Sequence, residues 1–453
     1  MKPRQYAYIY TIGCQMNTYD SEKISAVLGS MGYEKTYDLN QADLVVCNTC
    51  SIRKKAQEKA FSFLGKVAGR KNNKKNVISV MAGCVAQQEG ENVFKRIPNL
   101  DIVLGTQAFS QLKFHINAVR SGKKRISDIG EHEQIFELMP DFSTLEKGRA
   151  SRFVTIMQGC DNYCTYCVVP YVRGRERSRR PENIIREIEI LGDNGVKEVT
   201  LLGQNVNSYG QKEKLCSFPE LLEKICRIDT IKRIRFATSH PKDFSDDLIY
   251  AIRDNEKICS QVHLPVQSGS TRILKKMNRG YTCQDYMKRI EKLKKECPDI
   301  ALSSDMIVGF PSETETDFQQ TLDLVKEIEF DGLFAFSYSH RPNAPASKFS
   351  GEIDQKTKMT RLNHLLEMQE SFTWRKNQAC VGRQESVLVE GRSLKQRKGK
   401  GQCIDDMHQM TGRTDSGKIV HFCTKDVTLG DILKINIEQA YPHSLWGSVC
   451  YET

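Results

Sequence analysis

Three cysteines in one short segment are the clearest chemical feature of the sequence. Cys160, Cys164 and Cys167 have the spacing Cys-x₃-Cys-x₂-Cys and follow an apolar run of strand length, Phe153–Gln158. Three thiolates can hold three irons of a 4Fe–4S cluster and leave the fourth iron open. In such a site the open iron chelates S-adenosylmethionine (SAM), and one electron breaks its sulfonium C–S bond to give a 5′-deoxyadenosyl radical. A zinc knot is the alternative, but zinc prefers four ligands and no fourth ligand lies nearby.

A second set of cysteines is dispersed along the first hundred residues. Cys14, Cys50 and Cys84 each stand just past an apolar, strand-like run, at the expected turn into a helix. In open α/β sheets, ligands collect at the carboxyl ends of the strands. Consecutive turns would therefore bring the three thiols together, which predicts a second iron–sulfur cluster. Three separate buried thiols are the alternative.

The other ten of the sixteen cysteines show no comparable placement. Thiols stay reduced in the cytoplasm, which favours metal or catalytic use over disulfides. Cys47 lies inside an apolar run and is expected in the core. The remainder are interpreted as ordinary thiols: Cys216, Cys226, Cys259, Cys283, Cys297, Cys380, Cys403, Cys423 and Cys450.

The elements that must position the N-terminal cysteines alternate between strand and helix. Short apolar runs at Tyr6–Ile12, Leu44–Cys47, Val77–Ala82 and Ile102–Leu104 are separated by helix-like segments. This alternation predicts an open parallel sheet with helices on its faces. We expect this α/β domain to span residues 1–145.

The strand–helix rhythm restarts at Phe153 and continues for six units. Six units predict a partial (β/α)6 barrel rather than the closed barrel of eight, over residues 146–375. After about Lys376 the sequence changes to short β-type runs separated by glycines. That pattern predicts a small antiparallel β-barrel over residues 376–453.

Length and charge set limits on the function. The chain has 453 residues and a formal net charge of +11, which suggests an anionic partner such as nucleic acid. No apolar stretch approaches the roughly 20 residues that a membrane helix needs. The first residues show no signal peptide. We therefore expect a cytoplasmic protein with no membrane partner.

The sequence resembles the methylthiotransferase family of radical-SAM enzymes over nearly its whole length. The resemblance is carried by Gly13-Cys14-Gln15-Met16-Asn17, by the segments around Cys50 and Cys84, and by the run from Cys160 through Arg179. Two later segments, which begin at His263 and Ile307, resemble barrel strands of the family. The C-terminal segment resembles the RNA-binding TRAM module. Two loop positions depart from the family pattern, because Ser312 and Asn343 stand where the family usually has glycine.

Within the family, the chain looks most like the branch that acts on N(6)-isopentenyladenosine next to the tRNA anticodon, at position 37. The resemblance implies that one SAM methylates sulfur at the cluster on the N-terminal cysteines. A second SAM, at the Cys160–Cys167 cluster, activates the adenine C-2 position, which then receives the methylthio group. Other implied SAM contacts are Tyr166, Gly203, Gln204, Asn205, Gln267, Ser268, Val308 and Phe310.

Two basic runs are candidates for RNA contact, and a solvated charged face is the alternative for each. The first, just after the cluster loop, contains Arg173, Arg175, Arg177, Arg179 and Arg180. The second, in a predicted loop of the small barrel, contains Arg392, Lys395, Arg397, Lys398 and Lys400. We expect a tRNA anticodon stem-loop as substrate, with a flipped base. A low-potential flavodoxin- or ferredoxin-type electron donor and a monomeric state complete the expectation.

Three other functions compete with this interpretation. Within the family, the substrate could be threonylcarbamoyladenosine in tRNA or an aspartate of a ribosomal protein. From another class, the chain could be a non-catalytic iron–sulfur RNA-binding protein. A protein that only binds RNA would not need the three-cysteine site with its open iron.

Overall fold

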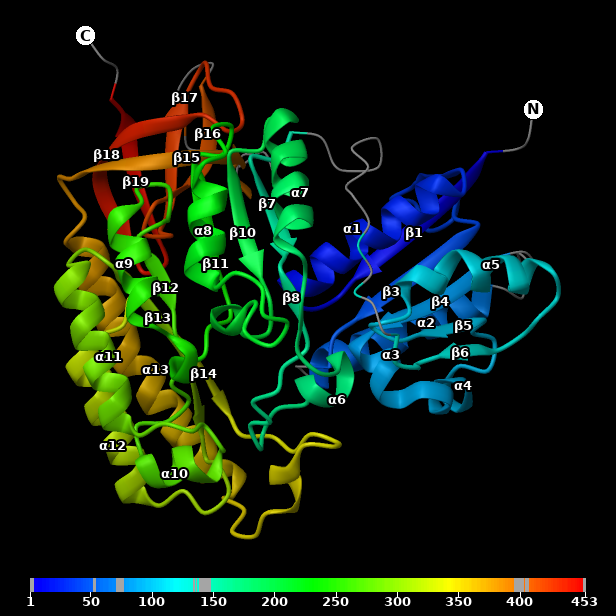
Figure 1. Ribbon diagram of the computed structural model, residues 1–453, viewed down its shortest axis with the longest axis horizontal. Coiled ribbons are helices and arrows are strands. Elements are labelled where there is room, and N and C mark those ends of the chain that lie inside the picture. The colour runs from blue at the N-terminus through cyan, green and yellow to red at the C-terminus, as the bar shows by residue number, and fades with distance from the viewer. Residues whose placement is uncertain are drawn as a thin grey trace.

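The computed structural model describes residues 4–51, 54–70, 77–132, 135, 137, 148–394, 403 and 407–450. It contains an N-terminal α/β body, a central body of parallel strands and helices, and a C-terminal β-barrel (Figure 1). The predicted boundary near residue 145 lies outside the described residues. No helix in these ranges combines the length and apolarity needed to cross a bilayer.

The N-terminal body is a six-stranded parallel sheet in the order β2-β1-β3-β4-β5-β6. Its strands are β1 (Gln5–Thr11), β2 (Tyr33–Lys35), β3 (Leu44–Thr49), β4 (Ile78–Gly83), β5 (Ile102–Leu104) and β6 (Ile126–Asp128). Every residue of β3 and β4 is buried, which explains their continuous apolar character. Helices α1 (Gln15–Ser30), α2 (Lys54–Arg70), α3 (Cys84–Glu89), α4 (Val93–Arg96) and α5 (Leu112–Arg120) connect the strands. The edge strands β2 and β6, of three residues each, were not predicted.

The central body is an open arrangement of six parallel strands, as predicted. β7 (Ser151–Thr155), β10 (Glu198–Leu202) and β11 (Arg233–Phe236) form one sheet, and β12 (Gln261–His263), β13 (Ala301–Val308) and β14 (Gly332–Ser337) form another. A single bridge between Ile234 and Ile258 joins them. Helices α7 (Pro181–Asp193), α8 (Phe218–Cys226), α9 (Asp246–Asp254), α11 (Cys283–Glu296), α12 (Glu315–Ile328) and α13 (Gln355–Gln378) cover the outer face and enclose the largest hydrophobic core.

The C-terminal body is a closed barrel in the order β15-β16-β17-β19-β18. Its strands are β15 (Gln384–Arg392), β16 (His408–Thr414), β17 (Ile419–Thr424), β18 (Ile432–Tyr441) and β19 (Ser444–Val449). The pairing of β17 with β19 is parallel, whereas the other pairs are antiparallel as predicted. Cys403 and Cys423 form a disulfide, so the interpretation of these two as ordinary thiols was wrong.

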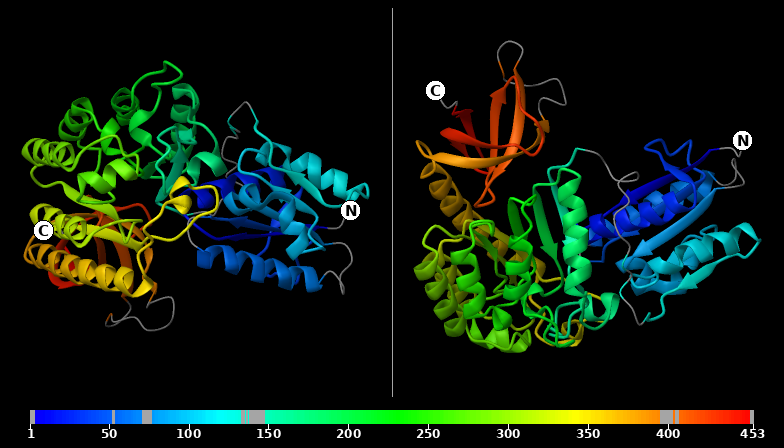
Figure 2. Two further views of the ribbon diagram at one scale, coloured as in Figure 1. Left: turned by 90° about the horizontal axis from the view of Figure 1, so that it is seen from below. Right: turned by 45° about the horizontal axis from the view of Figure 1, so that its top comes forward.

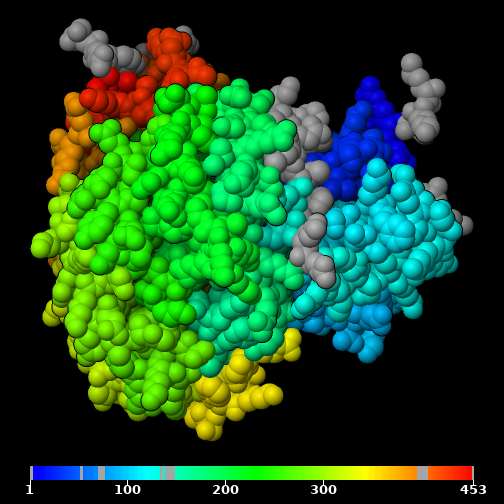
Figure 3. All heavy atoms as spheres, in the orientation of Figure 1, coloured from blue at the N-terminus to red at the C-terminus, as the bar shows by residue number. Residues whose placement is uncertain are grey.

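The barrel is attached to the amino ends of the central strands through two buried arginines of β11. Arg233 donates to the carbonyl oxygens of Ser386 (2.7 Å) and Arg413 (2.8 Å). Arg235 donates to the carbonyl oxygens of Thr414 (2.7 Å) and Asp415 (2.9 Å). The space-filling view shows the barrel seated on the central body, at a distance from most of the N-terminal body (Figure 3).

Candidate active site

The loop that carries Cys160, Cys164 and Cys167 follows the carboxyl end of β7 and the short strand β8 (Met157–Gln158). Gly159 enters the loop with φ +79°, and a Cβ there would lie 2.0 Å from the carbonyl oxygen of Arg175. Only glycine therefore fits at this entry. The Thr165 N–H donates to the carbonyl oxygen of Met277 (3.0 Å), which fixes the middle of the loop against the end of α10 (Thr271–Lys276).

These three thiols lie in surroundings that disfavour isolated thiolates. Burial raises the pKa of Cys160 to about 11 and that of Cys167 to about 12, with the charge of Cys164 adding to both. A cationic group reduces this penalty, because the Arg279 guanidinium donates to the Cys164 sulfur at 3.4 Å. Arg279 is itself fixed by bonds to the Pro265 carbonyl (2.6 Å) and the Tyr281 hydroxyl (2.9 Å).

The N-terminal cysteines follow three adjacent strands of the first sheet. Cys14 follows β1 and caps α1, Cys50 follows β3, and Cys84 begins α3 directly after β4. The hydrogen bond with Cys50 is the main cause that lowers the pKa of Cys14 to about 6. Burial raises the pKa of Cys84, although the guanidinium of Arg173 opposes the shift.

Glycines allow the turns before two of these cysteines to approach their neighbours closely. Gly13 has φ +142°, and a Cβ there would lie 2.3 Å from the Cβ of Cys50. Gly83 has φ +92°, and its Cβ would meet the Thr49 carbonyl oxygen at 2.5 Å. The Asn17 amide joins the turns by donating to the Asn48 side chain and to the Thr49 carbonyl, both at 3.0 Å.

The two sets of cysteines lie on packed elements. Helix α6 (Val169–Arg173), which follows Cys167, packs on α3, which begins with Cys84. Val168 and Val172 form a buried cluster with Cys84 and with Ala344 of the segment after β14. Figure 2 shows that segment, in yellow, reaching across to the N-terminal body. Tertiary packing therefore places both cysteine sets at one interface between the two bodies.

The donor sets fit iron–sulfur clusters. Each set contributes three cysteine sulfurs, and none of the six cysteines is in the disulfide. A cationic guanidinium lies beside each set, as three thiolates require. Among the described residues, no three His, Cys, Asp or Glu side chains are close enough to bind a single metal ion. Cluster thiolates bind different irons and lie further apart than the ligands of one ion.

Four of the predicted SAM contacts lie beside the cluster loop. Tyr166 is half-buried, and its hydroxyl accepts from Arg279 at 3.3 Å. Gly203 directly follows β10 against Met157. The side chain of Gln204 accepts from the Gly159 N–H (2.5 Å), and Asn205 donates to Asp243 (2.7 Å). All four stay predictions of SAM contact.

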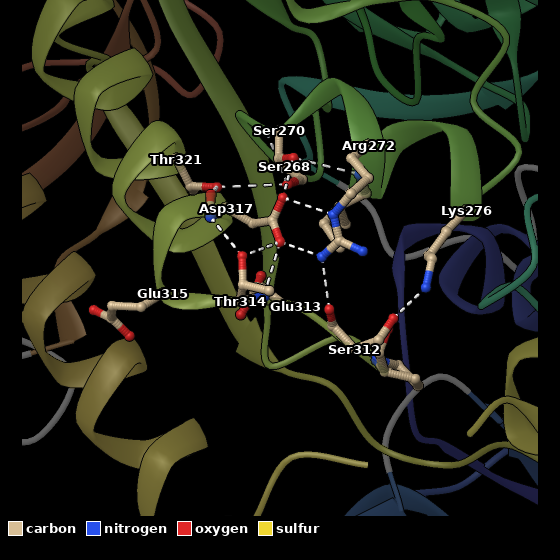
Figure 4. A network of polar contacts seen from close by, with 12 residues as sticks. Ser268, Ser270, Arg272, Lys276, Ser312, Glu313, Thr314, Glu315, Asp317 and Thr321 are labelled. Carbon is tan, nitrogen blue, oxygen red and sulfur yellow. Dashed lines mark hydrogen bonds and ion pairs between the residues drawn. The ribbon is translucent and has the colours of Figure 1, made fainter. Parts of the chain in front are cut away.

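The other four predicted SAM contacts are buried. Ser268 is fully buried in a polar network around Asp317, which accepts from Ser270 (2.6 Å) and from Arg272 (Figure 4). Val308 and Phe310 are fully buried in hydrophobic clusters. Gln267 is buried with φ +77°. Their burial does not test contact with SAM, which a residue can make through its backbone, so all four stay predictions of SAM contact.

Buried polar groups gather at the carboxyl ends of β10 and β11, and of these only Asn205 was predicted from the sequence. Asn205 Oδ1, Asn207 Oδ1, Ser239 Oγ and His240 Nε2 are buried and have no hydrogen-bond partner among the described residues. The His240 Nδ1 accepts from the Lys242 N–H at 3.2 Å, so Nε2 carries the ring proton. Burial lowers the pKa of His240 to about 2 and keeps the ring neutral. Such orphaned groups at a strand-end edge indicate a polar ligand. Their one signal in sequence is the polar pair Ser239-His240 just after β11.

The first basic run divides into buried and accessible arginines. Arg173 is 4% exposed and pairs with Asp20, whereas Arg179 is 2% exposed and pairs with Glu187 (2.7 Å each). These two cannot meet RNA phosphate, so the structure corrects the prediction for them. Arg175 and Arg180 are exposed and Arg177 is half-buried, and all three line an open surface cavity of about 1040 Å³. Contact of these three with RNA stays a prediction.

The second basic run lies mostly outside the described residues, which exclude Lys395, Arg397, Lys398 and Lys400. Arg392, at the end of β15, is exposed and lines an open cavity of about 1150 Å³. This cavity joins all three bodies, because Cys14, Thr200, His263 and Arg413 also line it. The C-terminal barrel and the N-terminal cysteine site therefore border one space.

Three segments of the chain match known protein families. Residues 154–325 match the Radical SAM superfamily, residues 6–105 match the uncharacterized protein family UPF0004, and residues 378–450 match the TRAM domain.

Similar proteins extend the match to nearly the full length. A "tRNA-2-methylthio-N(6)-dimethylallyladenosine synthase" of Syntrophus aciditrophicus is 47% identical over 99% of this chain and 95% of its own. A protein of the same name from Desulfosudis oleivorans is 48% identical over 97% of this chain and 96% of its own. Among solved structures, the radical S-adenosylmethionine methyltransferase TsrM of Kitasatospora setae, with tryptophan and a SAM analog bound, has a TM-score of 0.59 at 13% identity. The similarity covers 86% of this chain and 79% of TsrM, and shows a shared fold.

Proposed function

The chain belongs to the family of tRNA-2-methylthio-N(6)-dimethylallyladenosine synthases, and we propose that six of its cysteines form two cluster sites that serve this one reaction. It is a radical-SAM enzyme that adds a methylthio group to adenine C-2 of N(6)-isopentenyladenosine beside the tRNA anticodon. A 4Fe–4S cluster and SAM are its family's cofactors. The relatives' names favour this substrate over threonylcarbamoyladenosine and over a ribosomal-protein aspartate.

Helix α3, which begins with Cys84, packs against α6, which follows Cys167. This contact between the two cysteine sets is the observation that carries the two-site proposal. When bound, two clusters and SAM would supply radical chemistry and a sulfur donor, which an unactivated aromatic C–H demands and side-chain acid–base groups cannot provide. Cys160, Cys164 and Cys167 would hold one cluster, and Cys14, Cys50 and Cys84 the other. The protein's own part is to fix both sets at one interface.

The orphaned polar groups beside the cluster loop support a SAM site there. Asn205 is anchored by Asp243 and keeps Oδ1 for a ligand donor. The neutral His240 offers Nε2–H to a ligand acceptor, and its ring lies edge-on to Tyr281 at 5.7 Å. Together they present one donor and one acceptor in a buried place, as an amino-acid moiety requires.

The 1150 Å³ cavity would receive the flipped adenosine. Phe334 lies on β14 of the central body, yet 57% of its surface is exposed. It lines this cavity together with Cys14. An exposed aromatic side chain can stack on a base or pack against its hydrocarbon substituent. The TRAM barrel at the same opening would bind the RNA backbone, through residues that include Arg392.

An electron donor must reach the Cys160–Cys167 loop from outside the RNA site. The loop is accessible at Tyr163, which is 38% exposed. Lys212 and Lys242 contact the neighbouring residues Asp161 (2.7 Å) and Asn162 (3.2 Å). This basic rim supports an acidic low-potential donor of the flavodoxin or ferredoxin type. The tRNA substrate supports a cytoplasmic location.

Iron counting combined with product analysis tests the two-site proposal. Anaerobically reconstituted protein should bind about eight irons, and alanine at Cys160, Cys164 and Cys167 should leave about four and abolish SAM cleavage. Alanine at Cys14, Cys50 and Cys84 should also leave about four irons, retain reductive SAM cleavage and abolish methylthiolation of an isopentenylated anticodon stem-loop.

In the matched control, three half-buried cysteines that pack against the hydrophobic core of the central body are changed to alanine: Cys216, Cys226 and Cys297. This variant should keep all iron and both activities. Methylthiolation that survives loss of the N-terminal cysteines would refute their role. Loss of all iron from either active-site variant would refute two independent sites.

A further inference from the structure

Arg173 is a buried cation beside the Cys14, Cys50 and Cys84 site, and the proposed reaction gives it no role. Its guanidinium donates to Asp20 Oδ2 of α1 at 2.7 Å, and the side chains of this pair are 4% and 11% exposed. Arg173 follows Val172, which packs against Cys84 where α6 meets α3. The positive charge of Arg173 lowers the pKa of Cys14 and opposes the rise in the pKa of Cys84. A second arginine of the central body, Arg341, lies near Cys50.

The position of Arg173 is set by the loop that carries the other three cysteines. Arg173 ends α6, six residues after Cys167, and its carbonyl accepts from Gln107 at 3.3 Å. The Thr106 hydroxyl donates to the preceding Val172 carbonyl at 2.6 Å. Both bonds join α6 to the segment after β5. The positive charge beside the N-terminal cysteines, that of Arg173, therefore comes from the central body. Its position is fixed by α6, the short helix that follows Cys167.

A set of three thiolates, two of them buried, needs such a cation. Removing a charge from water costs several kcal/mol per ion unless an opposite charge lies beside it. Hydrogen bonds to the sulfurs and the local net charge also set the potential of an iron–sulfur cluster. Asp20 keeps the guanidinium in place, because a carboxylate holds a guanidinium in a defined geometry.

We propose that Arg173, held by Asp20, is a positioning residue of the Cys14, Cys50 and Cys84 site, where it compensates the thiolate charge, sets the potential of the cluster and ties this site to the Cys160–Cys167 loop. The inference rests on the proposed assignment of these cysteines to a cluster. It removes Arg173 from the RNA-binding surface and gives it a role in the chemistry.

Redox titration of a chain that holds only the N-terminal cluster tests this inference. The parent carries alanine at Cys160, Cys164 and Cys167, and its midpoint potential is followed by electron paramagnetic resonance and absorbance. Arg173→Gln removes a positive charge and should shift the potential to a more negative value. Asp20→Asn removes a negative charge at nearly constant shape and should shift it to a more positive value. Arg173→Lys keeps the charge and should stay closer to the parent than Arg173→Gln.

Opposite signs separate an electrostatic role from structural damage, which would move both variants the same way. Arg186→Gln, an exposed arginine on α7, is the matched control and should leave the potential unchanged. Shifts of equal sign in Arg173→Gln and Asp20→Asn, or potentials equal to the parent with full iron, would overturn the inference. If Arg173→Gln loses its iron, its potential cannot be measured. The inference is then overturned when Asp20→Asn has the same midpoint potential as the parent. A parent without iron would overturn the cluster assignment itself.

Discussion

Single residues show why two departures from the family pattern are tolerated. Ser312 and Asn343 stand where the family usually has glycine, and both have left-handed backbone conformations, with φ +65° and +71°. Asparagine adopts this region more readily than most residues. Ser312 is fixed by its N–H, which donates to the Gly351 carbonyl at 2.6 Å, and by a bond from Lys276 to its hydroxyl (Figure 4). Local hydrogen bonds thus compensate for the absent glycine at Ser312.

Glu176 gives a residue-scale prediction about pH. Burial, together with the charges of Asp161 and Asp243, raises the pKa of Glu176 to about 7 from an ordinary value of 4.5. Between these values the unfolded chain has released the proton while the folded chain keeps it, so this group lowers stability as pH rises from about 4.5 to 7. Glu176→Gln should match the wild-type melting temperature near pH 4 and exceed it by several degrees at pH 8, a gain of up to about 3 kcal/mol.

Thermal unfolding of anaerobically reconstituted protein across this pH range measures the effect. Glu223→Gln, an exposed carboxylate on α8, is the control and should follow the wild type at every pH. A difference between Glu176→Gln and wild type that stays constant with pH would contradict the raised pKa.

At the scale of elements, β11 connects the central body to the C-terminal barrel. Its alternate residues Arg233 and Arg235 face the C-terminal barrel and satisfy backbone carbonyls of β15, β16 and the turn after β16. Arg235 also pairs with the buried Glu198 of β10 at 2.9 Å. The two bodies are therefore joined by charge-assisted hydrogen bonds.

Arg235→Met should loosen this junction. The change removes the bonds to the barrel and leaves Glu198 buried without its cation, which costs about 3–5 kcal/mol. We expect a lower melting temperature and weaker binding of the tRNA anticodon arm, measured by fluorescence anisotropy, at unchanged iron content. Lys232→Met, at the exposed position just before β11, should leave both unchanged. Wild-type affinity in Arg235→Met would show that the junction does not position the RNA-binding barrel.

At the scale of the whole molecule, one cavity is bordered by three bodies. The N-terminal body contributes Cys14, the central body His263 and Phe334, and the barrel Arg392 and Arg413. On the proposed function, a flipped base in this cavity would lie beside Cys14 while the RNA backbone stays within reach of the C-terminal barrel.

The basic run between β15 and β16 in the sequence, predicted to be a loop, supplies the whole-molecule prediction. Changing Arg397, Lys398 and Lys400 to alanine should lower tRNA affinity and reduce the salt slope of binding by roughly 0.7–0.9 for each phosphate group that the loop no longer neutralises. SAM cleavage without tRNA should be unaffected, because the cluster loop lies in another body. Alanine at Lys59, Lys66 and Lys113, three exposed lysines of the N-terminal body, is the matched control. An unchanged slope in the loop variant would identify the loop as a solvated charge run.

The sequence by itself determined the division into three bodies and predicted the two sets of thiols that we propose as cluster ligands. The spacing of Cys160, Cys164 and Cys167 is local, so the chain can show it within eight residues. The turns at Cys14 and Cys50 could be predicted because the carboxyl ends of parallel strands share an edge.

Only the tertiary structure decided which charges serve which site. Five arginines in one run appear equivalent in sequence, but packing buries Arg173 against Asp20, 153 residues away, and leaves Arg175 exposed. Arg279 meets Cys164 across 115 residues. Ion pairs at such separations depend on how helices and loops from different bodies pack, and no periodicity or spacing in the chain records that packing.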